Sequence, residues 1–404
     1  MKKPTARLLD LSRLVSRAGR GRHTGIDRVE AAYLSALLAD DIPLFALVRS
    51  PIGLTLYDRR GVEALADRLV GGADWGRPHP LAYLFRRVSP IRRRVLSDIY
   101  RLCVARCRSG RGLGRMIGKS IAPGFVWVAV GHSNLRRETF DGVRASGGRS
   151  AVMIHDTIPL DRPEVQTDTA AARFSDRITL VSRHADLVIH TADATRATTE
   201  HWLAKAGRVP PGLTAHLGIV PPPVVQGDVP PDLRDLGTFF LFLGTLEPRK
   251  NLPLLLDTWA ELSRRLPEVE VPKLVLVGAL GWLSDDDRAR IAQGQAHVIT
   301  AGQISDGAVG ALLSQARALL MPSLIEGFGL PPGEALALGC PVVLSDLAVF
   351  REVFGNNPVY LDPTDLYLWA AEIQAIAQEK NRRKLTDVAL PTWKDHFKTV
   401  LKVL

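Results

Sequence analysis

Cysteine is scarce in this sequence of 404 residues, which contains only Cys103, Cys107 and Cys340. None of them forms a Cys-x-x-Cys pair, and no group of histidines accompanies them. A structural zinc site or a disulfide framework needs several such residues at close spacing, so neither is expected. The few thiols fit a reducing compartment.

Long apolar runs are also missing. The N-terminus is basic, but its apolar stretch is interrupted at Asp10 and Ser12, which is not the pattern of a secretory signal peptide. No run of about 18 apolar residues, the length that a membrane-spanning helix needs, occurs in the sequence. We therefore expect a cytoplasmic protein, with peripheral contact to the inner face of the membrane left open.

The net charge of +10 comes from one segment. Residues 86–119 contain eleven Lys and Arg and a single acid, Asp98, so this segment alone carries the whole excess. Two interpretations stay open: solvated, arginine-coated helices, or a surface for an anionic membrane, a phosphate-bearing acceptor or nucleic acid. Nucleic acid ranks last, because the sequence shows neither a helix-turn-helix nor interleaved aromatic residues.

Short β-branched runs alternate with stretches of helical period, which predicts an α/β fold with parallel sheets and helices on both faces. Five prolines within residues 220–232 oppose both helix and strand, so we place an interdomain linker there. The predicted organisation is one domain over residues 1–220, a second over 221–390 and a terminal helix over 391–404. Ligands are expected between the two domains, at the carboxyl ends of the strands.

The expected strands are short apolar runs, at residues 8–11, 43–48, 125–130, 151–155, 186–190, 213–217, 239–243, 273–277, 297–300, 318–321, 341–344 and 359–361. The expected helices lie mostly between them, at residues 26–38, 167–184, 194–205, 252–266, 286–292, 305–315, 333–338, 365–379 and 393–404.

The strongest local signal covers residues 322–335, where a strand runs into a loop with Glu326 and a helix start with Glu334. Gly327 and Gly329 let the backbone approach a ligand closely, and free amides at the helix start can receive an anion. Carboxylates beside a phosphate-sized hollow suit a sugar nucleotide, because they accept hydrogen bonds from hydroxyls. The competing interpretation is an ordinary glycine-rich turn in which Glu334 complements the helix dipole.

A second signal covers residues 239–251. A buried strand is expected to end at Gly244, and Arg249 and Lys250 follow just before a helix. A forked guanidinium and an ammonium point charge can together neutralise a diphosphate. The alternative is a solvated pair of cations, which would stand at the electrostatically unfavourable end of a helix.

Residues 244–251, 274–278 and 326–334, in this order and spacing, resemble the family 4 glycosyltransferases. These are retaining enzymes of the GT-B fold, in which two Rossmann-like domains face each other across a cleft, the first on the acceptor side and the second on the donor side. The resemblance implies that Glu326 contacts the donor sugar and Glu334 the nucleotide ribose. The donor-binding residues that it implies in this half are Gly244, Arg249, Lys250, Glu326, Phe328, Gly329, Leu330 and Glu334.

The first half of the chain resembles the family more faintly. His155 and Asp156, at the end of an expected strand, are similar to an element of mannosyltransferase-like members, which implies that His155 faces the reacting sugar. Taken alone, the pair would be interpreted as an ordinary turn. Residues 22–30 resemble the loop that closes over the donor phosphates or the acceptor, with Gly25 as its glycine. The basic approach to this loop, either solvated or in contact with an anionic acceptor, contains Arg17, Arg20 and Arg22.

Other nucleotide-binding and metal-binding motifs are incomplete or absent in this sequence. Residues 112–120 lack the first glycine of a phosphate loop, because Leu113 stands in its place. No Gly-x-Gly-x-x-Gly follows the first strand, and no Gly-x-Ser-x-Gly elbow occurs. The acidic run at residues 285–287 is interpreted as a helix cap. We expect neither a metal ion nor a cofactor besides the nucleotide-sugar co-substrate.

The predicted activity is that of a retaining, metal-independent hexosyltransferase in bacterial surface polysaccharide synthesis. Arg249 and Lys250 are expected to stabilise the leaving group, and His155 and Glu326 to orient the sugar. The resemblance favours GDP-mannose as donor and a glycan, free or linked to polyprenyl diphosphate, as acceptor. Alternatives are a UDP- or dTDP-sugar with a soluble acceptor, and a non-catalytic nucleotide-sugar-binding assembly protein.

For a membrane-borne acceptor, residues 86–119 are the expected contact with anionic lipid. The apolar side chains expected to face the lipid are Tyr83, Leu84, Phe85, Ile91, Val95 and Ile99.

Overall fold

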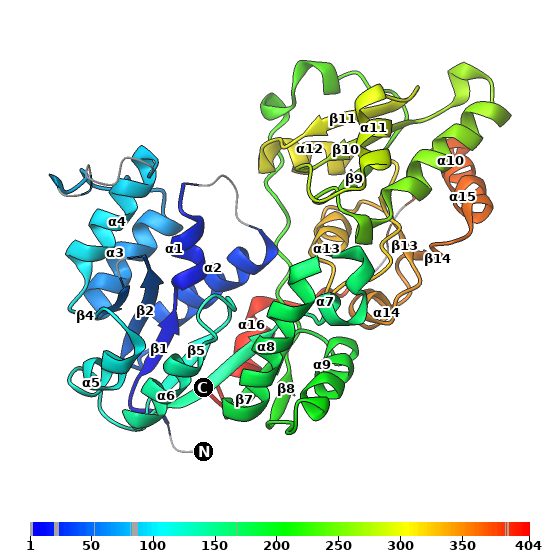
Figure 1. Ribbon diagram of the computed structural model, residues 1–404. Helices are drawn as coiled ribbons and strands as arrows, with labels where there is room; N and C mark the ends of the chain where they lie inside the picture. Colours follow the sequence, from blue (N-terminus) through cyan, green and yellow to red (C-terminus); the bar gives the residue numbers. More distant parts are fainter. Residues whose placement is uncertain are drawn as a thin grey trace.

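The computed structural model describes residues 3–19, 24–51, 53–80, 82, 88–166, 168–383, 385 and 388–404. These residues form two α/β lobes, each built around its own sheet (Figure 1). Arg20, Arg22, Tyr83, Leu84, Phe85 and Arg86, named above, lie outside the described residues.

The N-terminal sheet has the order β4-β3-β2-β1-β5-β6-β7-β8. The strands are β1 (Arg7–Asp10), β2 (Leu44–Ser50), β3 (Gly53–Tyr57), β4 (Ala105–Cys107), β5 (Val126–Ala129), β6 (Arg149–Ile154), β7 (Leu187–His190) and β8 (Gly212–Thr214). The sheet is parallel except at one edge, where β2–β3 and β3–β4 are antiparallel. A two-residue connection joins β2 to β3, and a connection this short permits only an antiparallel hairpin.

Helices cover both faces of this sheet, and they are α1 (Ser12–Arg17), α2 (Gly25–Leu38), α3 (Arg59–Leu69), α4 (Pro90–Leu102), α5 (Leu113–Gly118), α6 (Arg137–Ala145), α7 (Ile158–Asp161), α8 (Asp168–His184) and α9 (Asp193–Lys205). Strand β5 shows the two-sided burial: Val126 and Val128 enter one apolar core, and Trp127 enters the other. This alternation is what a strand buried on both faces requires.

The C-terminal sheet is parallel in every described pairing, with the order β11-β10-β9-β12-β13-β14. This order is that of the doubly wound nucleotide-binding fold, whose ligands bind where the strand order reverses. The strands are β9 (Phe239–Leu243), β10 (Lys273–Val277), β11 (Val298–Gly302), β12 (Leu319–Met321), β13 (Val342–Ser345) and β14 (Val359–Leu361). The helices are α10 (Leu252–Arg265), α11 (Asp285–Gln293), α12 (Asp306–Gln315), α13 (Leu330–Ala337), α14 (Ala348–Phe354) and α15 (Leu366–Gln378).

The last helix, α16 (Trp393–Val400), returns to the N-terminal lobe (Figure 1). Its buried His396 contacts two other segments: Nε2 lies 2.8 Å from the Tyr33 hydroxyl of α2, and Nδ1 lies 3.0 Å from the His216 carbonyl. Because a carbonyl only accepts, Nδ1 carries the ring proton and Nε2 accepts from Tyr33. Burial lowers the pKa of His396 to about 4.

This histidine predicts a loss of stability in mild acid. Its folded pKa lies below the ordinary value of about 6.5, so the unfolded chain binds the proton first as the pH falls. Between pH 6.5 and pH 4 we expect the titration of His396 to lower the unfolding free energy by about 2–3 kcal/mol. Urea unfolding at both pH values checks this, since His396→Gln should show a shallower decline than the unchanged protein. Parallel declines would contradict it.

The basic segment packs into the N-terminal lobe more than its sequence suggests. Val95 and Ile99 of α4 are fully buried, so the expectation that they face lipid is wrong. The single acid, Asp98, is also buried and accepts from Arg68 Nε at 2.9 Å and Arg101 Nη1 at 2.7 Å. Helical period alone indicates which residues share a face, but it does not say whether that face meets lipid or protein.

Candidate active site

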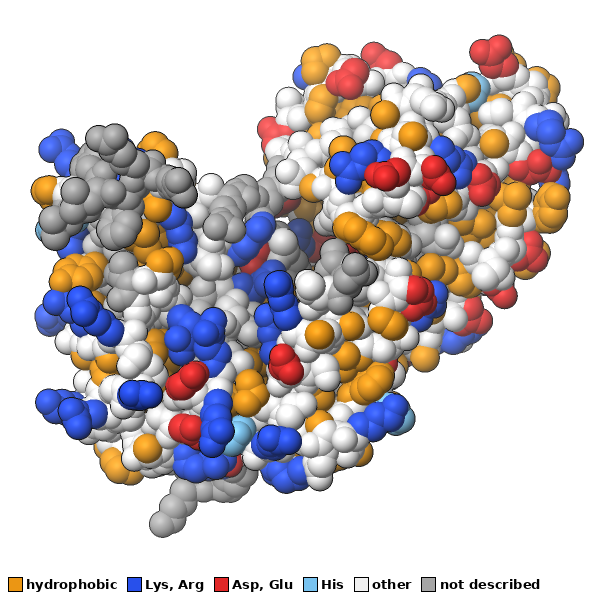
Figure 2. Space-filling view, viewed as in Figure 1, with side chains coloured by type: hydrophobic (Ala, Val, Ile, Leu, Met, Phe, Trp, Pro, Cys, Tyr) orange, Lys and Arg blue, Asp and Glu red, His pale blue; other side chains and the backbone are white. Residues whose placement is uncertain are grey.

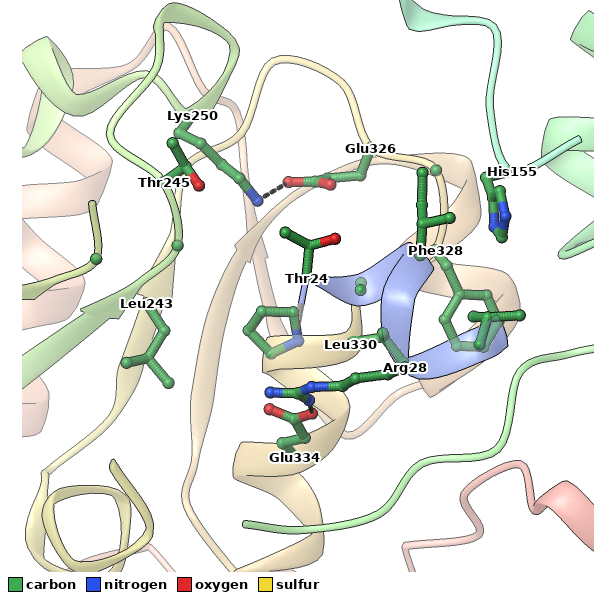
Figure 3. A pocket seen from close by; sticks show the side chains of 18 of the residues that line it. Thr24, Arg28, His155, Leu243, Thr245, Lys250, Glu326, Phe328, Leu330 and Glu334 are labelled. Atoms are coloured by element: carbon green, nitrogen blue, oxygen red, sulfur yellow. Dashed lines mark hydrogen bonds and ion pairs between the residues drawn. The ribbon is translucent and has the colours of Figure 1, made fainter. Parts of the chain in front are cut away.

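A cleft of about 580 Å³ lies between the lobes. The residues nominated from the sequence come together along its walls, namely Gly25, His155, Gly244, Arg249, Lys250, Glu326, Phe328, Gly329, Leu330 and Glu334. Figure 3 labels six of them, His155, Lys250, Glu326, Phe328, Leu330 and Glu334, and shows the start of α2 opposite the loop of Glu326. The cleft is therefore built from both lobes, at the carboxyl ends of their central strands.

The cations of the C-terminal lobe converge on Glu326. Arg249 Nη1 lies 2.9 Å from one carboxylate oxygen of Glu326, and Lys250 Nζ donates to the other (Figure 3). The Ser323 hydroxyl donates to the same carboxylate at 2.8 Å, and Glu247 pairs with Arg249 Nε at 2.6 Å. The Arg249 carbonyl accepts from Leu324 N at 2.8 Å, which joins the two motif loops directly.

Burial sets the electrostatics of this cluster. Lys250 is only 4% exposed, and burial lowers its pKa while the Glu326 carboxylate opposes that shift. Burial by itself opposes ionisation of Glu326, but Arg249 and Lys250 outweigh it and lower the pKa of Glu326 to about 2. Glu326 is therefore ionised at neutral pH, and it neutralises cations that face the cleft.

The start of α13 differs from its prediction. The helix begins at Leu330 instead of residue 333, so Glu334 lies in its second turn and not its first. Pro331 and Pro332 have no amide hydrogen, which leaves the amides around Leu330 as the donors at this end. Gly329 has φ +99°, a left-handed conformation that favours glycine. The interpretation of Glu334 as a first-turn dipole partner is thereby weakened.

Glu334 reaches across the cleft. Its carboxylate accepts from Arg28 Nη1 of α2, and this ion pair joins the lobes (Figure 3). Burial raises the pKa of Glu334, and Arg28 opposes that shift. The sequence analysis gave Arg28 no role, because nothing near it in sequence indicates a partner 306 residues away.

His155 stands at the end of β6, on the wall of the cleft that the N-terminal lobe forms. Its Nε2 donates to the Val130 carbonyl at 2.7 Å, and burial lowers its pKa to about 4. The ring is therefore neutral at physiological pH and serves as a polar, uncharged wall of the cleft. Its neighbour His132, which the sequence analysis passed over, lies 5.3 Å away between ring centroids.

Gly327 allows the lobes to touch at this point. A Cβ atom there would lie 2.8 Å from the His155 carbonyl oxygen, closer than real Cβ contacts come. The Thr191 hydroxyl lies within hydrogen-bond distance of the carbonyls of both His155 and Gly327. Gly25 is different, since a Cβ there would make an ordinary contact of 3.4 Å with Leu330. The loop start at Gly25 lines the cleft without strictly requiring glycine.

Glu352 of α14 is a second residue that the sequence analysis missed. Its carboxylate accepts from Asp193 N at 2.6 Å and Ala194 N at 2.8 Å, and it lies 2.7 Å from His216 Nε2. It thus caps the N-terminus of α9 from the opposite lobe, where helix amides are otherwise unpaired. In sequence it looks like an ordinary surface acid.

Replacing Glu352 should loosen the lobes. We expect Glu352→Ala to lower the unfolding free energy by about 2 kcal/mol, because charged hydrogen bonds to two amides are lost. Urea unfolding measures this, and Glu268→Ala, an exposed acid of the same lobe, is the matched control. Equal stabilities of the two variants would show that the cap contributes nothing.

Comparison with known proteins bears on the fold and the family. Residues 231–388 match the family described as glycosyl transferases group 1. The fold matches Anabaena HepE in complex with UDP and glucose, with TM-score 0.57, 14% identity, and 98% and 95% of the two chains covered. It also matches an α,α-trehalose-phosphate synthase of Burkholderia xenovorans, with TM-score 0.58, 12% identity, and coverage of 98% and 100%. The fold is therefore GT-B, and the predicted fold class is confirmed.

The family match covers the C-terminal lobe, and together with the curated relatives it confirms the resemblance of this half to the group 1 glycosyltransferases. The serotype-specific mannosyltransferase WbdA of Escherichia coli is 27% identical over 283 residues, or 65% of this chain and 34% of WbdA. The O-antigen chain mannosyltransferase B of Escherichia coli is 33% identical over 149 residues, or 36% of this chain and 39% of that protein. The matched part of the chain thus spans about a third of the length of WbdA.

Two kinds of feature are absent from the described residues. Among them, no three His, Cys, Asp or Glu side chains are grouped as metal ligands would be. Within the same described parts, no helix combines the length and apolar character needed to span a bilayer.

Proposed function

We propose that this protein is a retaining mannosyltransferase that uses GDP-mannose as donor and a glycan of a bacterial surface polysaccharide as acceptor. The observation that carries the proposal is the buried cluster of Arg249, Lys250 and Glu326 at the interlobe cleft. Cations, exposed amides and carboxylates together suit a diphosphate bearing a sugar. The mannosyltransferase names of the relatives support the choice of mannose.

In the proposed reaction an acceptor hydroxyl attacks the anomeric carbon, and the bond from that carbon to the diphosphate oxygen breaks. The nucleoside diphosphate leaves with the electron pair, and Arg249 and Lys250 neutralise its growing charge. The departing phosphate takes the proton of the acceptor hydroxyl, so no protein nucleophile is required. Glu326 and the neutral ring of His155 hold the sugar in position.

Thermal unfolding with GDP, UDP and dTDP tests the donor. A ligand at 100 times its Kd stabilises the fold by about 2.7 kcal/mol, so GDP should raise Tm more than the other two. Transfer from GDP-mannose, followed by NMR of the anomeric proton, then tests retention. Stabilisation by UDP or dTDP alone would assign another donor, and GDP binding without transfer would indicate a non-catalytic binding protein.

We further propose that the acceptor glycan is carried on polyprenyl diphosphate, which places the protein at the inner face of the membrane. The exposed arginines of the basic segment, which provide the proposed contact with anionic lipid, include Arg94, Arg108, Arg111 and Arg115. Flotation with anionic vesicles at low salt tests this contact, and recovery of the protein free of vesicles would contradict it.

A further inference from the structure

A group of arginines on the N-terminal lobe lies beside the cleft. It consists of Arg13 of α1, Arg136 at the N-cap of α6, and Arg173 and Arg177 of α8. Figure 2 shows Lys and Arg side chains gathered over the region of α1, α6 and α8, below the hollow between the lobes. We call these four residues the arginine cluster.

Arg177 lies one turn beyond Arg173 on α8. Its side chain is half-buried, and besides burial the charges that lower its pKa are those of Arg173, Arg13 and Arg136. Burial and nearby groups also lower the pKa of His132, and the charged residues among them are Arg177 and Arg13. Within the described parts of the chain, no salt bridge joins Arg136, Arg173 or Arg177 to a carboxylate.

Contacts connect the arginine cluster to the cleft. Arg13 is anchored by Asp27 at 2.8 Å and by the Thr24 hydroxyl at 3.1 Å, and Thr24 lines the cleft. On the other side, Phe174 follows Arg173 in sequence, and its ring centroid is 6.1 Å from that of His132. His132 in turn packs beside His155 of the cleft wall.

Without a bound anion, the arginine cluster is electrostatically unfavourable for the folded protein. Arg173 and Arg177 stand four residues apart on α8, and like charges at this spacing destabilise a helix. Partial burial of Arg177 also disfavours its charge, and no described carboxylate forms a salt bridge with it. Both effects reverse when an anion binds, because forked guanidinium groups match phosphate oxygens.

We propose that Arg136, Arg173 and Arg177, with Arg13 as their anchor, bind a phosphate or diphosphate group carried by the acceptor. The inference rests on the proposed function, since it assigns the anion to the substrate that enters from this lobe. The donor diphosphate is a different ligand, because Arg249 and Lys250 face the cleft from the opposite lobe.

Calorimetric titration with inorganic pyrophosphate tests the site. The titration uses Lys250→Ala protein, in which binding at the donor cations is weakened. In this background we expect Arg177→Gln to weaken pyrophosphate binding about tenfold. Arg149→Gln is the matched control, because Arg149 is an exposed arginine at the opposite end of β6 from His155. Equal binding by the two double variants, or no binding by Lys250→Ala protein, would overturn the proposal.

A second probe, geranyl diphosphate, distinguishes a lipid-linked diphosphate from a phosphate group without lipid. Geranyl diphosphate binding more tightly than pyrophosphate supports a lipid-linked diphosphate, and equal affinities support a phosphorylated group without lipid. Arg173→Gln, a change at an exposed side chain, replaces Arg177→Gln if that variant fails to fold. Consumption of GDP-mannose by the unchanged protein tests the donor chemistry separately. Pyrophosphate binding that depends on Arg177, without donor consumption, would reject the proposed function and keep the anion site.

Discussion

Replacing Lys250 by alanine is expected to slow sugar transfer by about 10²–10³-fold, the loss typical when one preorganised group that stabilises developing charge is removed. Lys250 is almost fully buried, and its ammonium faces the cleft between Glu326 and the start of α2 (Figure 3). In such a site water screens charge poorly, so one ammonium has a large effect on a leaving diphosphate. Nucleoside diphosphate affinity should fall as well, because the same charge acts on the departed product.

Steady-state rates with GDP-mannose and calorimetric affinities for GDP measure both effects. Arg288→Ala is the matched control, because it removes an exposed cation of α11 in the same lobe. Lys250→Arg restores the charge with a different shape and should recover part of the rate. A Lys250→Ala variant that folds and transfers sugar as fast as Arg288→Ala would contradict the assignment of the donor site.

Replacing Glu326 by glutamine is expected to separate binding from transfer. The substitution keeps the volume of the side chain but removes the charge that neutralises Arg249 and Lys250. Nucleoside diphosphate affinity should therefore rise about threefold to tenfold, as expected when a competing charge-assisted pair is lost. Transfer should fall about 10²-fold, because the carboxylate that we propose to hold the sugar hydroxyls is gone.

The pH dependence of the remaining activity is a second test of the role of Glu326. Glu326 opposes the lowering of the Lys250 pKa by burial, so Glu326→Gln should lower that pKa further. The activity that remains should then decline at a lower pH on the alkaline side than in the unchanged protein. Glu268→Gln, at an exposed acid, is the control for both measurements. Weaker GDP binding together with an unshifted alkaline limb would reject this account of Glu326.

The C-terminal lobe was largely predictable from its sequence. Its strands are short runs of buried apolar residues, such as Phe239–Leu243 and Lys273–Val277, and turn residues follow each of them. The edge of the N-terminal sheet was not predicted, since Gly53–Tyr57 and Ala105–Cys107 are short and the second carries an arginine. Such edge strands are stabilised by pairing with a neighbour, which local sequence does not reveal.

The part of the cleft formed by the C-terminal lobe was predictable for a similar reason. Arg249 follows β9 within six residues, and Glu326 follows β12 within five, so neighbouring strands bring them to one edge. The part of the cleft formed by the N-terminal lobe was harder to predict from the sequence. His155 was named, but His132 and the arginine cluster were not, because they meet only when α1, α6 and α8 pack together.

Two α/β halves with charged residues at their strand ends could be inferred from the chain alone, because strand periodicity and short spacings are local properties. Which of those charges meet depends on how distant elements pack. Arg28 pairs with Glu334 across 306 residues, and Glu352 caps α9 across 159 residues. Val95 and Ile99 turned inward for the same reason, since burial and ion pairing depend on whole packed elements and on the water that packing removes.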